Sequence, residues 1–391
     1  MTATAAIDAV LETAVRAGKI AGVVAIAARP DGTVYQNAFG EKGLGSGVPM
    51  TVDTVFHLAS MTKALVATAA MQLVEQGRIG LDEPLGKYAK QLAEPKVVDG
   101  FADDGTPILR PARTQMTLRH LMTHTSGFAY ELWNAKMDRY MKQTGLPAGR
   151  TGKLAALDVA LAFDPGTAWA YGISIDWIGR LVEMVSGQDL NAYTRDHLFR
   201  PLGMSDTGFT LDDAQCARGA GMHQRGADGT LTPSPFVRPE PREFFAGGGA
   251  IYSTGPDYIR FERMILNGGE LDGVRVLRPE TVAAMAQNQM GSLDVQPMPS
   301  SDPALSCDCE LFPGMRKKWG MSFLINTEDA PGRRRAGSLA WAGLRNTYNW
   351  IDPKSGLCGV LMTQTMPFAD PAVLATLDAF ETEVYRVFGQ R

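Results

Sequence analysis

The chain has 391 residues, of which 45% are hydrophobic and 20% charged, a composition typical of a soluble globular protein with one large or two smaller domains. Its formal net charge of −4 offers no basic field to a polyanion, so nucleic acid is not expected as a partner. No basic segment precedes an early apolar one, and the apolar run at residues 20–28 is too short to span a bilayer. We therefore expect a cytoplasmic protein with no membrane partner.

Strand signals come first along the chain and helical signals follow. Residues 22–28 and 33–39 are two β-prone runs, and Pro30, Asp31 and Gly32 between them favour a turn, so a β-hairpin is predicted. Residues 62–77 then show apolar side chains in a helical pattern that ends at a glycine. Because this run is apolar on most faces, we expect a buried helix.

The middle of the chain, about residues 85–215, has mainly helical periodicity. The predicted helical segments are residues 118–123, 153–162, 175–185 and 190–199. Strand signals return at residues 250–253, 321–325, 338–341, 347–351 and 357–363, with helical runs at 257–266, 279–289 and 371–388. Residues 293–312 are rich in Pro, Ser and Asp and are expected to form a surface loop.

Strands at both ends of the chain with a helical middle predict an α/β (α+β) fold. We expect one mixed, mainly antiparallel sheet flanked by helices, built from residues 1–60 and 216–391, and an inserted helical domain at residues 61–215. A cleft between the two parts is the expected place for a site.

Cysteine and histidine usage does not predict a metal site. Four cysteines stand at spacings that match no zinc or thioredoxin pattern, and there are only five histidines. Cys307 and Cys309 would point the same way on an extended chain, which leaves a metal or redox pair open. We expect reduced, incidental thiols and no metal or organic cofactor.

The run HLASMTKAL at residues 57–65 holds the first candidates for chemistry. Ser60 stands just before the predicted helix, and Lys63 follows three residues later, so both side chains share one face. Free backbone N–H groups at a helix start favour an oxyanion on an attacked carbonyl. A serine N-cap and a surface lysine are the other interpretation of the same residues.

Further segments support the catalytic interpretation. SMTK at 60–63 is followed by LRHLMTHTSGF at 118–128 and WAYGISIDWIG at 169–179. In this order, the segments resemble the serine β-lactamase and penicillin-binding protein superfamily, in particular the class C β-lactamase-like family VIII carboxylesterases, over nearly the whole chain. The absence of a G-x-S-x-G pentapeptide argues against an α/β-hydrolase.

The resemblance implies a catalytic role for three residues. Ser60 is similar to the nucleophile, Lys63 to its charged partner, and Tyr171 to the tyrosine that takes the serine proton. A phenol needs its pKa of about 10 lowered to act near neutrality. We expect the Lys63 ammonium to supply that shift.

Departures from the β-lactamase pattern bear on the substrate. Ile173 stands where those enzymes carry an asparagine, with Ser174 as a partial substitute. Trp341, Ala342 and Gly343 stand where they carry Lys-Thr-Gly. An indole replaces an ammonium that would bind a carboxylate, so a neutral ester is expected.

The same resemblance implies further site residues. The N–H groups of Ser60 and Leu344 would form the oxyanion hole, and Trp341 and Gly343 would lie against the substrate, where only glycine permits close backbone approach. Tyr130 and Trp133 are candidates to line an acyl or alcohol pocket, or to pack between helices.

Three further features are expected to have supporting roles. The triple glycine at residues 247–249 resembles a segment beside the active site. His124 is interpreted as a structural hydrogen-bonding residue, and Asp176 as a helix-start or packing carboxylate.

The sequence therefore predicts a serine carboxylesterase that hydrolyses neutral, short-chain or small-alcohol esters through an acyl-enzyme on Ser60. The alternatives are a β-lactamase or D-amino peptidase, an acyltransferase in which an alcohol replaces water, and an inactive ligand-binding homologue. The expected partner is a small-molecule ester, and the oligomeric state is left open.

Overall fold

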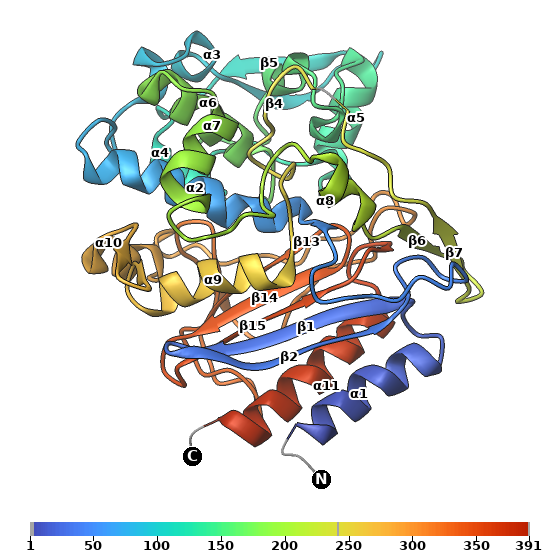
Figure 1. Cartoon of the computed structure of the whole chain (residues 1–391). Helices are drawn as coiled ribbons and strands as arrows, with labels where there is room; N and C mark the ends of the chain where they lie inside the picture. Colours follow the sequence, from blue (N-terminus) through green and yellow to red (C-terminus); the bar gives the residue numbers. More distant parts are fainter. Residues whose placement is uncertain (1–3, 241, 390–391) are drawn as a thin grey trace.

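The centre of the molecule is a seven-stranded antiparallel sheet built from both ends of the chain (Figure 1). The computed structural model describes residues 4–240 and 242–389. The strand order is β11 (Lys317–Trp319), β12 (Leu324–Asn326), β13 (Leu339–Gly343), β14 (Thr347–Asp352), β15 (Leu357–Met362), β1 (Gly22–Arg29) and β2 (Gly32–Gly40). Val24 of β1 lies opposite Met362 of β15, which joins the two ends of the chain.

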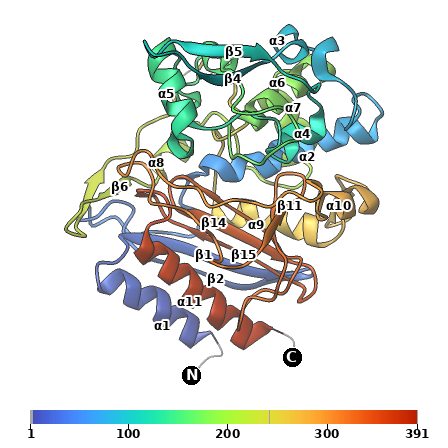
Figure 2. The ribbon, with the colours of Figure 1, turned by 180° about the vertical axis from the view of Figure 1, so that it is seen from behind.

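Helices cover both faces of this sheet, so its central strands are buried. Figures 1 and 2 show α1 (Ala5–Arg16) and α11 (Pro371–Phe388) side by side on one face, and α9 (Gly255–Leu266) on the other, near α10 (Pro279–Met285). Successive β1 side chains alternate between these faces, as the pleat requires. Val23, Ala25 and Ala27 join the α1–α11 core, and Val24, Ile26 and Ala28 join the core on the α9 side.

The middle of the chain forms a mainly helical part above the sheet in Figure 1. Its central helix, α2 (Thr62–Glu75), is buried from Thr62 to Leu73, as its apolar sequence predicts, and packs against α6 (Ser174–Ser186). The other elements are α3 (Lys90–Ala93), β4 (Lys96–Phe101), β5 (Pro107–Pro111), α4 (Leu118–Met122), α5 (Ala135–Thr144), α7 (Leu190–Thr194) with a π-turn (Arg195–Phe199), and α8 (Asp213–Ala217).

Four small sheets lie outside the main one among the described residues. Strand β3 (Phe56–His57), which lies directly before the predicted nucleophile in the chain, pairs with β8 (Tyr252–Ser253). The remaining strands are β6 (Met222–Arg225), β7 (Leu231–Ser234), β9 (Glu270–Leu271), β10 (Val274–Arg275) and β16 (Thr365–Met366). Short 3₁₀ turns occur at Ala59–Met61, Leu85–Lys87, Glu131–Trp133, Gly149–Thr151 and Leu154–Asp158.

The predicted architecture is confirmed: a mixed, mainly antiparallel sheet flanked by helices, with a helical part from the middle of the chain. Several elements were not predicted, among them helices α1 and α5, strand β11 and the hairpins β4–β5 and β6–β7. Residues 153–162 form a short 3₁₀ turn and then extended chain, because Leu161 exchanges backbone hydrogen bonds with Lys96 and Val98 of β4. Tertiary pairing thus outweighs the helical periodicity there.

The domain boundaries at residues 60 and 215 stay a prediction. Within residues 4–240 and 242–389, no helix combines the length and apolar character needed to cross a bilayer.

Candidate active site

Ser60 lies on a turn with unusual backbone geometry. The 3₁₀ turn Ala59–Met61 joins β3 to α2, and Ala59 has a φ of 47°, in the left-handed region that non-glycine residues seldom adopt. Strain of this kind persists only where surrounding structure holds it, and it clusters at functional sites. Ser60 lines a cavity of about 330 Å³.

Lys63 lies behind Ser60 with its side chain almost wholly buried. Its Nζ is 2.6 Å from the carbonyl oxygen of Gly248, 3.2 Å from Ser60 Oγ and 3.2 Å from the hydroxyl of Tyr130. Burial lowers the pKa of Lys63 to about 7, although the nearby Asp176 carboxylate favours the charged form. A substantial neutral fraction is therefore present near pH 7, and neutral Nζ can accept a proton from Ser60.

Tyr171 lies at the same site, as predicted. The Nζ of Lys63 is 4.8 Å from the centre of its ring, and Trp341 Nε1 donates a 2.9 Å hydrogen bond to its hydroxyl. Burial raises the pKa of Tyr171, against the opposing effect of hydrogen bonding with Ser60 and Trp341. The expected lowering of this pKa by Lys63 is thus not found in the free protein, because desolvation dominates and the lysine itself tends to neutrality.

Trp341 belongs to an aromatic cluster behind the cavity. Its ring lies 4.8 Å from that of Tyr171 and 4.6 Å from that of Trp319, centre to centre, and Trp169 and His124 also pack against Trp319. Neither Trp341 nor Gly343 lines the cavity, although both were predicted to contact substrate. In this structure the indole instead donates a hydrogen bond to the hydroxyl of Tyr171.

Gly343 has a packing reason to be glycine. A Cβ at this position would lie 2.1 Å from the carbonyl oxygen of Leu58, two residues before Ser60. The hydroxyl of Thr347 donates to the same carbonyl at 3.1 Å. The close backbone approach predicted at Gly343 is therefore an approach to Leu58, just before the turn that carries Ser60. This contact holds Ser60 and Leu344 at a set distance from each other.

The predicted oxyanion hole has its two donors on the cavity wall. Ser60 and Leu344 both line the cavity. Within the described residues, the backbone N–H of neither has a hydrogen-bond acceptor. Two unpaired N–H groups beside a nucleophile can stabilise an oxyanion.

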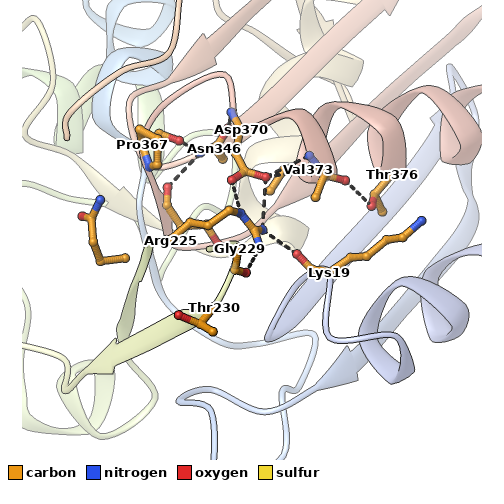
Figure 3. A network of polar contacts seen from close by, with 12 residues as sticks. Lys19, Arg225, Gly229, Thr230, Asn346, Pro367, Asp370, Val373 and Thr376 are labelled. Carbon is orange, nitrogen blue, oxygen red and sulfur yellow. Dashed lines mark hydrogen bonds and ion pairs between the residues drawn. The ribbon is translucent and has the colours of Figure 1, made fainter. Parts of the chain in front are cut away.

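The turn that carries Leu344 is anchored by Asn346. This residue has a φ of 57°, and its Nδ2 donates to the carbonyl oxygens of Thr365 (2.8 Å) and Pro367 (2.7 Å). Its Oδ1 accepts from the backbone N–H of Asp370. Figure 3 shows this network continuing through Asp370, the N-cap of α11, to Arg225. These hydrogen bonds connect the turn that carries Leu344, called here the oxyanion turn, to the main sheet and to helix α11, which covers that sheet.

Asp176 and the triple glycine support Lys63. Asp176 is buried in the first turn of α6, and its Oδ1 accepts a 2.8 Å hydrogen bond from the N–H of Gly248. Because Gly248 in turn accepts from Lys63, the carboxylate helps to position the lysine. Burial raises the pKa of Asp176, and the charges of Lys63 and Arg242 oppose that shift. Asp176, Gly248 and Gly249 also line the cavity, and the glycines form a turn there.

His124 is a neutral structural residue, in agreement with its predicted role. It is fully buried, and Nδ1 accepts a 3.4 Å hydrogen bond from the N–H of Gly172. Burial and the charge of Lys63 hold its pKa well below the usual range. Ser174 does not replace the missing asparagine, because its buried hydroxyl pairs with that of Ser126 at 2.7 Å.

The predicted pocket residues Tyr130 and Trp133 line the cavity. Trp133 Nε1 donates to Ser306 Oγ at 3.1 Å, and Leu305 of the same 293–312 segment also lines the cavity. Tyr130 has a second role that sequence reasoning missed, because its hydroxyl is a partner of Lys63.

Other wall residues also lacked a sequence signal. His57, Arg242 and Arg345 line the cavity together with the ion pair of Arg150 and Glu131 (2.9 Å). His57 begins the run at residues 57–65 but was given no role there, and Arg242, Arg345 and Arg150 belong to no motif, so only the fold brings these residues together. Met222, Leu132 and Met366 complete much of the apolar wall.

The cysteines lie outside this site. All four are free thiols, and the described residues contain no group of three or more His, Cys, Asp or Glu side chains arranged to hold a metal ion.

The sequence and the fold are similar to those of known proteins over nearly the whole chain. A family model described as Beta-lactamase matches residues 7–383. The chain is 34% identical to a monacolin J acid methylbutanoyltransferase of Aspergillus terreus, over 96% of this chain and 94% of that protein. It is 30% identical to esterase EstB of Burkholderia gladioli, over 96% and 94%. Unliganded simvastatin synthase from Aspergillus terreus superposes with a TM-score of 0.84 at 30% identity, covering all of both chains.

Proposed function

Because this chain belongs to the beta-lactamase family of serine hydrolases, we propose that it cleaves a carboxylic ester through an acyl-enzyme on Ser60 and passes the acyl group to water or to an alcohol. The observation that carries this proposal is the 3.2 Å contact between Ser60 Oγ and a buried lysine Nζ at the wall of a cavity. Tyr171 is proposed to act together with Ser60 and Lys63.

In the proposed acylation step, Ser60 Oγ bonds to the carbonyl carbon and its proton passes to neutral Lys63. The N–H groups of Ser60 and Leu344 receive the oxyanion. When the tetrahedral intermediate collapses, the ester C–O bond breaks and the leaving alcohol takes the proton back through the hydroxyl of Tyr171. This assigns the first proton transfer to Lys63 instead of Tyr171, because the phenol has a raised pKa and the lysine a lowered one.

Deacylation repeats these steps with a new nucleophile. Water or an alcohol gives its proton to Lys63 and attacks the acyl carbonyl, and Ser60 Oγ leaves and recovers a proton. Water makes the protein a carboxylesterase of the family VIII type, and an alcohol makes it an acyltransferase. The acyltransferase is a full second candidate, because the methylbutanoyltransferase relative is 34% identical and the cavity has apolar walls suited to an organic acceptor.

The first experiment measures hydrolysis of short 4-nitrophenyl esters by wild type, Ser60→Ala, Lys63→Ala and Tyr171→Phe, each checked for folding by circular dichroism. We expect Ser60→Ala to lower kcat at least about a thousandfold. Labelling by a fluorophosphonate tests for an inactive homologue. No mass increase on the wild type, or an equal increase on Ser60→Ala, would favour that alternative.

The second experiment separates the active alternatives. Adding a small alcohol to the ester assay distinguishes transfer from hydrolysis by the ratio of new ester to free acid. A chromogenic cephalosporin tests for β-lactamase activity, and much greater efficiency on it than on the esters would contradict the proposed substrate class. The cytoplasmic location stays a prediction that cell fractionation can check.

A further inference from the structure

The active-site cavity is lined by two arginines that have no protein counter-charge among the described residues. Arg242 and Arg345 both line the cavity that contains Ser60. Within the described residues, neither guanidinium makes a hydrogen bond or ion pair with a protein group, whereas Arg150 on the same wall is paired with Glu131 at 2.9 Å. Arg242 and Arg345 therefore lack, in this part of the chain, the carboxylate partner that Arg150 has.

These two arginines lie near each other and near His57. Burial lowers the pKa of Arg345, and the charge of Arg242 lowers it further. Both charges also act on His57, whose pKa is held well below its usual range, chiefly by burial. The imidazole is therefore neutral at pH 7 and supplies no third charge, but its Nδ1 is buried without a partner.

The carboxylates on the cavity wall are committed elsewhere. Glu131 pairs with Arg150, and Asp176 accepts from the Gly248 N–H beside Lys63. A partly buried guanidinium with no anion beside it is unfavourable, and a ligand carboxylate would satisfy its fork of donors bidentately. Such a group would reduce the repulsion between the arginines as well.

From this arrangement we propose that Arg345, assisted by Arg242, binds a carboxylate of the substrate, so that the preferred substrate is an ester that carries a free carboxylate near its scissile bond. Arg345 follows Leu344, the predicted oxyanion donor, and both residues line the same cavity as Ser60, so a carboxylate held by Arg345 would share that cavity with the reacting carbonyl. The inference rests on the proposed function and replaces the neutral ester that was expected from the uncharged Trp341 alone.

The test compares two pairs of matched esters. The carboxylate is on the acyl side in 4-nitrophenyl hemiglutarate, with 4-nitrophenyl valerate as the neutral match. It is on the leaving-group side in 4-acetoxybenzoate, with phenyl acetate as the neutral match. We expect wild type to have at least about tenfold higher kcat/KM for the anionic member of one pair, after correction for intrinsic reactivity. The pair that shows the preference tells which side of the ester faces Arg345.

Variants tie the preference to the named residues. Arg345→Gln should lower kcat/KM for the favoured anionic ester at least about tenfold more than for its neutral match. Arg150→Gln, which removes a paired arginine from the same wall, should change both values in parallel. Equal losses on both esters with Arg345→Gln, or no anionic preference in the wild type, would overturn the inference while Ser60-dependent hydrolysis of neutral esters leaves the proposed function intact.

A binding measurement does not depend on turnover. Tryptophan fluorescence of folded Ser60→Ala should report saturable binding of the intact anionic ester, and the double variant with Arg345→Gln should bind it at least about tenfold more weakly. Arg345-dependent binding with no hydrolysis by wild type would support the carboxylate site and contradict the proposed function. Binding unaffected by Arg345→Gln would contradict the site.

Discussion

The indole Nε1 of Trp341 donates a 2.9 Å hydrogen bond to the hydroxyl of Tyr171, and this bond joins the Trp341-Ala342-Gly343 segment to the segment at residues 169–179. Both residues are buried, and Trp341 is absent from the cavity wall. The bond occupies one acceptor position of the phenol and directs its O–H away from the indole. In the proposed reaction, Trp341 would therefore act by orienting Tyr171.

The first prediction concerns this orientation. Trp341→Phe keeps an aromatic ring and removes the N–H donor, so we expect kcat to fall about tenfold or more with a smaller change in KM. The matched control is Trp169→Phe, because the Nε1 of Trp169 is buried without a partner in the same aromatic cluster. Steady-state kinetics on one short ester checks both. Similar kcat losses in the two variants would show that cluster packing matters and the hydrogen bond does not.

The second prediction concerns pH. The pKa of Lys63 is about 7 in the folded protein, so its neutral, proton-accepting fraction grows as pH rises through that value. We expect kcat/KM to increase with pH along a limb centred near 7. Asp176 favours the charged lysine, so Asp176→Asn, which keeps an oxygen for the Gly248 N–H, should move this limb to lower pH. A limb that stays in place or moves to higher pH would contradict the assignment of the base to Lys63.

The sequence predicted which residues lie together at the candidate site better than it predicted the pKa values of those residues. Ser60, Lys63 and Tyr171 were found because each lies in a short motif whose order along the chain is recognisable. The pKa values of Lys63 and Tyr171 shift mainly through burial, and burial is set by helix α2 and the aromatic cluster together. No local pattern contains that information.

The same reasoning explains what was missed in the cavity and the fold. Arg345 follows a motif but belongs to none, and its lack of a partner is visible only once the other side chains around the cavity are placed. In the fold, strands of the main sheet were predicted because apolar β-prone runs are locally visible. Residues 153–162 were not, since their conformation depends on pairing with β4, far away in sequence.

The third prediction concerns Gly343. A Cβ there would lie 2.1 Å from the backbone carbonyl oxygen of Leu58 and 2.3 Å from the side-chain Oγ1 of Thr347, which leaves little room to relax. We expect Gly343→Ala to lower the free energy of unfolding by about 1–3 kcal/mol and to lower kcat at least about tenfold by displacing the nucleophile turn. Urea unfolding and ester kinetics measure the two effects. Gly32→Ala is the control, because a Cβ at Gly32 would meet no atom within 4 Å, and near-normal behaviour is expected of it.

The final prediction concerns the anchor of the oxyanion turn. Asn346→Asp keeps an oxygen that can accept from the Asp370 N–H but places a carboxylate oxygen where Nδ2 now donates to the carbonyls of Thr365 and Pro367. We expect the free energy of unfolding to fall by about 2–4 kcal/mol, because two buried acceptors lose their donor and face a negative charge. The kcat should fall as well, since the Leu344 N–H moves with the turn. Tyr348→Phe removes one hydrogen bond to the same amide, at 2.7 Å, and should cost about 1 kcal/mol with kcat nearly unchanged. If Asn346→Asp lowered stability and left kcat intact, the turn would hold the oxyanion donors without this anchor.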